Sequence, residues 1–255
     1  MSLVIVALAV ALTSYAASPE AIQRKRARRA ERLKAGVLEK AAPGKVFRVL
    51  DVSEALPNAT VDSLTKSMRQ MCLVPLEIAH GKKLEGCPIE AAGKLVAQEN
   101  VGAGVLVVSD PKLPITLAAP DRRWAVLNVA SLQADKPSHE VFMRRFAKVY
   151  WGAIARAMGA GNSTFAGCVL TPFSNVRELD AVLATAPCPE AYNKILEGAK
   201  ASGIGMITLA TYRTACQQGW APAPTNDVQK AIWDEVHAMP TAPIKIKPET
   251  KKVDR

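Results

Sequence analysis

Histidine is scarce in this chain of 255 residues. The three histidines are His80, His139 and His237, and no two of them stand four residues apart, so the HExxH pattern of zinc peptidases is absent. His139-Glu140 begins like that pattern, but we expect an exposed pair in the first turn of a helix. The GxSxG turn of serine hydrolases and a glycine-rich phosphate loop are also missing. These absences exclude the usual sequence signatures of three large enzyme classes.

Aromatic residues are also few, at 5% of the chain. The formal net charge is +10, but about nine of these charges lie in two terminal segments, 24–34 and 245–255. A groove that binds nucleic acid needs basic side chains on a folded surface, often with aromatic rings that stack on bases. We therefore expect solvated basic ends and no nucleic-acid partner.

The N-terminus carries an apolar run from Leu3 to Leu12, followed by the small-residue stretch Ser14-Tyr15-Ala16. This length and ending are typical of a signal peptide, although no basic residue precedes the run and a basic cluster follows it. We predict a signal peptide over 1–18, a basic linker over 19–42 and an exported protein, periplasmic or secreted. The alternative is a short membrane anchor, with the basic residues on lipid headgroups.

Five cysteines are compatible with export. Cys72 and Cys87 lie close in sequence, as do Cys168 and Cys188, and Cys216 is left over. In an oxidising compartment this count favours two disulfides and one free thiol. The alternative is five buried thiols.

Hydrophobic periodicity predicts an α/β fold with a mixed sheet and packed helices. The expected strands are 45–52, 73–78, 105–109, 115–118 and 124–129, and the expected helices before the last strand are 58–71 and 89–98. A long helix follows, capped by Ser138 and closed by Gly159 and Gly161. Its predicted buried face consists of Phe142, Phe146, Val149, Tyr150, Ala153 and Ala157, and its predicted solvent face of Arg144, Arg145 and Lys148.

The last part of the chain predicts a helical extension over 191–240 and a basic tail over 241–255. Helices are expected at 190–202 and 225–238. The segment 206–218 favours a helix, with a strand as the alternative.

Several short motifs follow the long helix at definite spacings: Met158-Gly159-Ala160-Gly161-Asn162, Cys168-Val169-Leu170, Phe173-Ser174-Asn175, Arg177-Glu178-Leu179-Asp180 and Cys188-Pro189. Over 43–190 the chain resembles the archaemetzincins, a branch of the metzincin zinc proteases. That family carries HExxHxxGxxH on its long helix, then CVM, FSN, an acidic helix start and CPxC. The resemblance implies a zincin-like fold for 43–190.

The same resemblance implies that the metal-binding residues have been lost. The three zinc-ligand positions fall on Gly152, Arg156 and Asn162, and the position of the general base falls on Ala153. A glycine, a permanent cation and a neutral amide do not form a zinc site. We expect no metal and no other cofactor.

The second, cysteine-rich zinc site of the family is also incomplete. Cys168 and Cys188 occupy two of its positions, whereas Ser163 and Ala191 stand where the family has cysteines. A disulfide between Cys168 and Cys188 could cross-link this region instead.

Arg156 has two interpretations. It could hold an anion such as a peptide carboxylate at the former metal position, or it could extend to solvent. The sequence favours an exported, catalytically inactive pseudoprotease that binds a protein or peptide or acts as a scaffold. One alternative is an active peptidase of metallopeptidase descent with an unrecognised site. Another is a membrane-tethered component of a larger assembly.

Overall fold

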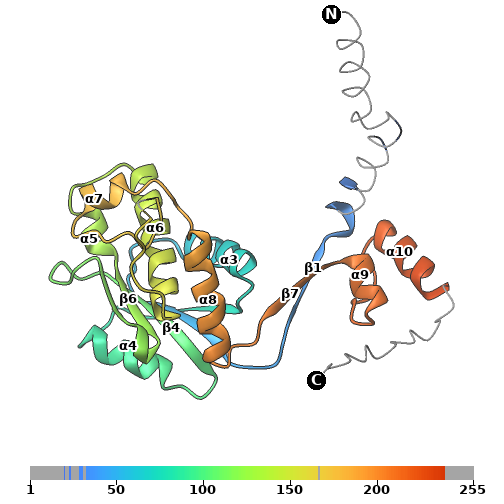
Figure 1. The fold of residues 1–255 in the computed structure, drawn as a ribbon, viewed down its shortest axis with the longest axis horizontal. Coiled ribbons are helices and arrows are strands. Elements are labelled where there is room, and N and C mark those ends of the chain that lie inside the picture. Colours follow the sequence, from blue (N-terminus) through green and yellow to red (C-terminus); the bar gives the residue numbers. More distant parts are fainter. Residues whose placement is uncertain (1–19, 21–22, 24–28, 31–32, 166, 239–255) are drawn as a thin grey trace, which may run out of the picture. The chain divides into compact units, whose positions relative to one another are not determined.

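The computed structural model describes residues 20, 23, 29–30, 33–165 and 167–238 (Figure 1). The predicted signal peptide or anchor, 1–18, and the basic tail, 241–255, lie outside the described residues, as does most of the basic cluster 24–34. Within the described part, no helix is both long enough and apolar enough to cross a bilayer. The chain divides into two compact units, one formed by Lys40–Thr208 and the other by the residues on either side of it.

A five-stranded sheet forms the centre of the Lys40–Thr208 unit. Its strands lie in the order β3-β2-β4-β6-β5. The first four are parallel, and β5 is an antiparallel edge strand. The bounds are β2 (Val46–Asp51), β3 (Leu76–His80), β4 (Val101–Val108), β5 (Thr116–Ala119) and β6 (Trp124–Asn128). This arrangement confirms the predicted α/β fold with a mixed sheet.

Two strands begin three or more residues away from their predicted starts. Strand β3 begins three residues after Leu73, because Leu73 ends the preceding helix in a left-handed conformation with φ 55°. Strand β4 begins at Val101 rather than at 105. The glycines Gly102 and Gly104 interrupt its apolar pattern, so periodicity alone detected only the second half of the strand.

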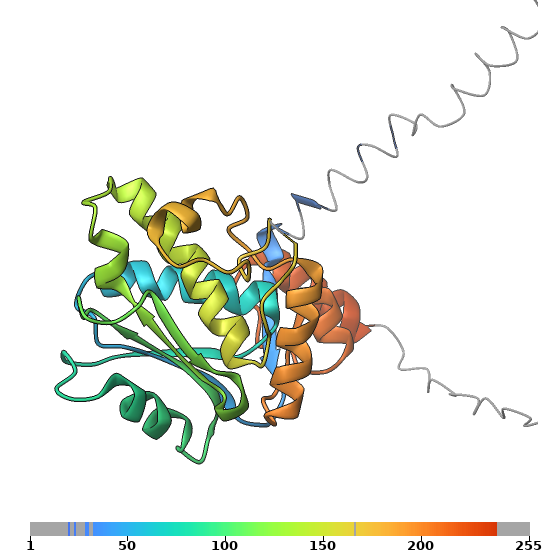
Figure 2. The same ribbon diagram turned by 60° about the vertical axis from the view of Figure 1, so that its left-hand side comes forward.

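Helices cover both faces of the sheet (Figure 2). The helices of this unit are α3 (Asn58–Cys72), α4 (Pro88–Val96), α5 (Val129–Gln133), α6 (His139–Ala157), α7 (Val176–Ala181) and α8 (Pro189–Ala201), with a short 3-10 helix η1 (Pro120–Arg122). Helix α4 packs on one face over Leu106 and Val126. Helices α3 and α6 pack on the other face in the main core, which contains Phe47 and Val105.

Helix α6 matches its prediction at both ends. The Ser138 hydroxyl accepts a hydrogen bond from the Val141 backbone N–H at 3.3 Å, and Gly159 follows the helix with φ 91°. The six residues of its predicted inner face are all buried. Gly161 does not take the left-handed conformation.

The predicted solvent face of α6 is wrong for two of its three residues. Arg144 is exposed, as predicted, but Arg145 and Lys148 are buried. The Arg145 guanidinium donates to the carboxylates of Asp135 and Asp180, and the Lys148 ammonium donates to the Leu179 carbonyl. Helix α7 and the segment after α5 therefore cover this side of α6, and they supply the acceptors that allow two cations to be buried.

The second unit contains α9 (Tyr212–Gln217) and α10 (Asp227–Ala238). A small core there joins Ala35, Tyr212, Cys216 and Ile232. Strands β1 (Val37–Ala41) and β7 (Ile207–Thr211) pair as a two-stranded sheet. The boundary between the two units falls within this sheet, after Glu39 in β1 and after Thr208 in β7. The segment 206–218, predicted as a helix with a strand as the alternative, is a strand followed by a helix. The predicted linker, 19–42, ends in a strand. Helix α8 contacts α6 and α3, and so belongs to the sheet-containing unit.

The chain enters and leaves the sheet-containing unit at neighbouring points. The Ala42 N–H donates to the Met206 carbonyl at 2.8 Å, and the Lys45 N–H donates to the Gly203 carbonyl at 2.9 Å. We call these contacts the seam. A Cβ atom on Gly44 would lie 2.7 Å from the Gly205 nitrogen, so this close approach of two backbones requires glycine.

Candidate functional site

The candidate site lies in the second half of α6. Gly152 and Ala153 are buried, and Arg156 is half-buried. A Cβ atom on Gly152 would lie 2.9 Å from Nη1 of Arg156 and 3.3 Å from the Val169 carbonyl oxygen. The guanidinium therefore lies back along the helix over Gly152, in space that a side chain at that position would need. Asn162 is exposed in the loop after the helix.

These residues do not suit a zinc ion. Gly152 and Ala153 offer no donor atom, Arg156 is a cation, and Asn162 provides only an amide oxygen, whereas zinc sites use imidazole, thiolate and carboxylate. Across the part of the chain that the structure describes, no three His, Cys, Asp or Glu side chains come close enough together to hold a metal ion. The donor set at this site and the metal therefore do not fit one another.

One hydrogen-bond donor of Arg156 lacks an acceptor in the described part of the chain. Its Nη1 is buried and has no hydrogen-bond partner among the residues that the structure describes. Burial lowers the pKa of the Arg156 guanidinium, and the neighbouring Cys168 sulfur acts in the opposite direction. Leaving a buried donor without a partner costs about 1–3 kcal/mol. A carboxylate would supply the missing acceptor, and the anion-binding role of Arg156 stays a prediction.

A pair of thiols lies next to this site. Cys168 is buried, and Cys188 is half-buried at the N-terminus of α8. The Cys188 N–H donates to the Cys168 sulfur at 3.4 Å, and the Ser163 hydroxyl lies 3.9 Å from the Cys188 sulfur. The structure thus brings Ser163, Cys168, Cys188 and the start of α8 with Ala191 together.

The surroundings of Cys188 favour its thiolate. Burial alone would raise the pKa of Cys188, but hydrogen bonds from Cys168, from the Ala191 backbone and from Ser163 outweigh it, and the pKa is lowered. Both thiols are free in this structure, and the disulfide between them stays a prediction.

The other cysteines lie apart. Cys72 is buried in the main core, where burial raises its pKa to about 11. Cys87 is exposed and precedes α4, which covers the opposite face of the sheet. The structure does not bring these two residues together. Cys216 is buried in the second unit, and burial raises its pKa.

Sequence reasoning missed the partners of His80. Its Nε2 lies 2.9 Å from Asp62 Oδ1, and its Nδ1 lies 3.6 Å from Asp51 Oδ2. Asp51 is buried and ends β2, and His80 ends the neighbouring parallel strand β3. The polar residues at the ends of two adjacent parallel strands were the available signal. His139 lies in the first turn of α6, as predicted, and His237 stacks on Trp233.

No family model and no curated protein matches this chain. Among solved structures, it is similar to an archaemetzincin from Methanopyrus kandleri, with 15% sequence identity and a TM-score of 0.47 over 61% of this chain and 96% of that one. It is also similar to a zinc-dependent peptidase from Methanocorpusculum labreanum, with 15% identity and a TM-score of 0.46 over 58% of this chain and 99% of that one. At this identity the likeness concerns the fold and assigns no role to any residue.

Proposed function

We propose that this chain is a catalytically inactive protein of metallopeptidase-like fold that binds a protein or peptide partner. The proposal rests on one observation: the Arg156 guanidinium lies over Gly152, where a side chain of residue 152 would otherwise extend. A cation fills the side-chain space of a metal-ligand position, and Ala153 offers no group that could act as a general base. The helix is kept as part of the core, while the residue types that hydrolysis would need are missing.

The partner that suits this site carries a carboxylate. A carboxylate at this guanidinium would form a charge-assisted hydrogen bond with an N–H that has no acceptor among the described residues. A peptide C-terminus or an acidic side chain has this chemistry.

Two exposed apolar residues, in the loops that follow α6 and α7, add support for a macromolecular partner. Phe165 is 64% exposed and Leu183 is 87% exposed. Their loops are joined by a hydrogen bond of 3.1 Å from the Ala184 N–H to the Gly167 carbonyl. A protein partner that covered these two loops would remove both apolar side chains from water.

Zinc content tests the absence of metallopeptidase chemistry. The protein is refolded with one equivalent of zinc, dialysed and measured by elemental analysis, and we expect no stoichiometric zinc. A variant with Cys168→Ser and Cys188→Ser controls for metal held by the thiols alone. One tightly bound equivalent in both proteins would overturn the proposal. Cleavage of a peptide library that chelation blocks would support an active peptidase instead.

Export belongs to the same proposal and rests on the apolar run from Leu3 to Leu12 within the predicted signal peptide, 1–18. N-terminal sequencing of protein recovered from an expressing bacterium tests it. A mature chain that starts after residue 18 is expected, and an intact N-terminus on a cytoplasmic protein would refute export.

A further inference from the structure

The parallel strands of the sheet end at a topological switch point. From the carboxyl end of β2 the chain passes through α3 to β3, on one side of the sheet. From the carboxyl end of β4, which lies next to β2, the chain passes to β5 and β6 on the other side. Because the two connections leave in opposite directions, a crevice is expected between them, and ligands of open α/β sheets commonly bind there.

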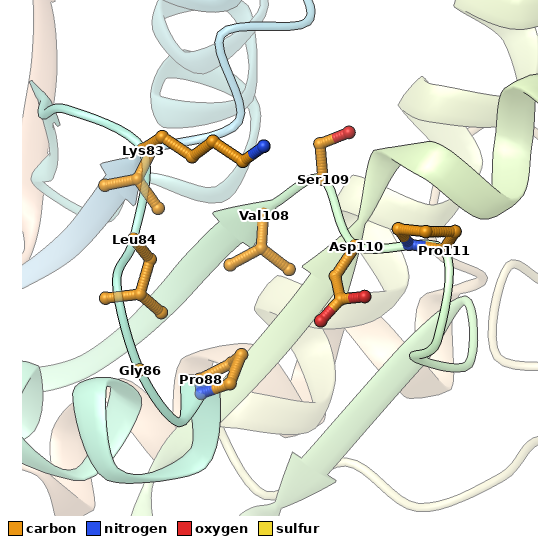
Figure 3. Close-up of a pocket in the computed structure, with 9 residues that line it drawn as sticks. Lys83, Leu84, Gly86, Pro88, Val108, Ser109, Asp110 and Pro111 are labelled. Carbon is orange, nitrogen blue, oxygen red and sulfur yellow. The ribbon is translucent and has the colours of Figure 1, made fainter.

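A cavity of about 150 Å³ lies at this point (Figure 3). Val52, which follows β2, and Val108, which ends β4, contribute to its lining, and the loop before α4 contributes Lys83 and Leu84. A cavity of about this volume in another protein holds a molecule the size of benzene. The space therefore suits a ligand of roughly six to eight non-hydrogen atoms.

Two opposite charges flank the cavity. Figure 3 shows Lys83 extending from one loop and Asp110 on the loop after β4, with Val108 between them. The only hydrogen bond to the Asp110 carboxylate in the described structure is the one that Oδ1 accepts from the Lys112 N–H, at 2.9 Å. Neither Lys83 nor Asp110 forms an ion pair with another described residue. Both charges are thus available to a ligand.

A buried side chain holds the Asp110 loop in place. Asn128, which is fully buried at the end of β6, accepts from the Asp110 N–H at 3.0 Å and donates to the Asp110 carbonyl at 2.7 Å. Its amide also donates to the Leu113 carbonyl at 2.8 Å. The carboxylate is therefore presented on a fixed backbone, which reduces the entropic cost of binding.

We propose that this cavity binds a small zwitterion, an aliphatic α-amino acid. Its carboxylate pairs with the Lys83 ammonium, its ammonium pairs with the Asp110 carboxylate, and its side chain contacts Val52, Leu84 and Val108. A ligand with one charge would leave one of the two protein charges without a partner. This site is separate from the Arg156 site and does not depend on the function proposed for it.

Nuclear magnetic resonance of the isotope-labelled full chain tests the proposal with three probes. These are L-valine, N-acetyl-L-valine, which lacks the cation, and L-valinamide, which lacks the anion. We expect saturable shifts of the amide signals of 84–87 and 108–110 with L-valine, and binding weaker by about tenfold for each of the other two probes.

Two substitutions test the contributions of the two charges one at a time. Lys83→Gln is expected to weaken binding of L-valine and N-acetyl-L-valine about tenfold and to leave L-valinamide unchanged. Asp110→Asn is expected to weaken L-valine and L-valinamide and to spare N-acetyl-L-valine, and its amide oxygen still accepts from the Lys112 N–H. Lys82→Gln and Asp121→Asn, outside the cavity lining, are the matched controls. Absence of saturable shifts at millimolar L-valine, or shifts that survive both substitutions, would overturn the proposal.

Discussion

Replacement of Gly152 by alanine provides a direct measure of the arrangement at the candidate site. In the interior of a helix, Gly→Ala usually stabilises a protein by about 0.5–1 kcal/mol. Here the new Cβ would lie 2.9 Å from Nη1 of Arg156, so the buried guanidinium must move. The guanidinium is the far end of a flexible side chain and can rotate aside, so we expect the loss of its packing on the helix to offset the gain and to leave Gly152→Ala close to neutral.

The same replacement should behave differently once the guanidinium is removed. In an Arg156→Ala background the remaining close atom is the Val169 carbonyl oxygen at 3.3 Å, which is present in both backgrounds and cancels in the comparison. Gly152→Ala should then regain its helical gain, giving a coupling energy of about 1 kcal/mol between the two positions.

Urea unfolding of the wild type, the two single variants and the double variant measures this coupling. Gly93→Ala in α4 is the matched control, because a Cβ atom there meets no atom within 4 Å. Its effect should be the same with and without Arg156. A coupling energy within about 0.5 kcal/mol of zero, as found for independent sites, would refute the arrangement of Arg156 over Gly152.

Two further predictions concern the charge cluster of α6 and the thiols. Hydrogen bonds from Arg145 lower the pKa of the Asp180 and Asp135 carboxyl groups in the folded protein. The two carboxylates therefore stabilise the fold above the unfolded pKa of about 3.9, and this stabilisation is lost as the pH falls through their lower folded-state pKa. The difference in urea midpoint between wild type and Arg145→Met should therefore be large near neutral pH and shrink in acid, and a difference independent of pH would contradict this assignment. Cys188, whose pKa is lowered, should react with an aromatic disulfide reagent at neutral pH faster than Cys72, whose pKa is raised. Mass spectrometry of timed reactions checks the order, and equal rates would contradict it.

Most strands and the longer helices of the sheet-containing unit could be predicted because they have regular apolar patterns, whereas the first half of β4 and the short helix α5 could not. The inner face of α6 from Phe142 to Ala157 follows from helical spacing alone. The burial of Arg145 does not, because its partner Asp180 stands 35 residues away in sequence. Periodicity treats every arginine as exposed, and only the packing of α7 against α6 shows otherwise.

The candidate site, too, could be predicted only in part from the sequence. The prediction of a poor metal site rests on the identities of Gly152, Ala153, Arg156 and Asn162, because ligand chemistry depends on residue type. The position of the guanidinium over Gly152 depends on the side-chain conformation of Arg156, which no sequence pattern specifies. The cavity beside Asp110 was missed because it depends on strand order. The chain leaves the parallel strands β2 and β4 toward opposite edges of the sheet, and this is visible only in the folded sheet.

The seam has a consequence for the order in which the protein folds. It joins Ala42 to Met206 and Lys45 to Gly203, so nearly all of the sheet-containing unit lies between its two halves in sequence. Closing so long a loop costs chain entropy, which the few hydrogen bonds of the seam do not offset by themselves. The seam should therefore form after the sheet has collapsed, and it should be among the first contacts to open, while the core of α3, α6 and the sheet is still folded.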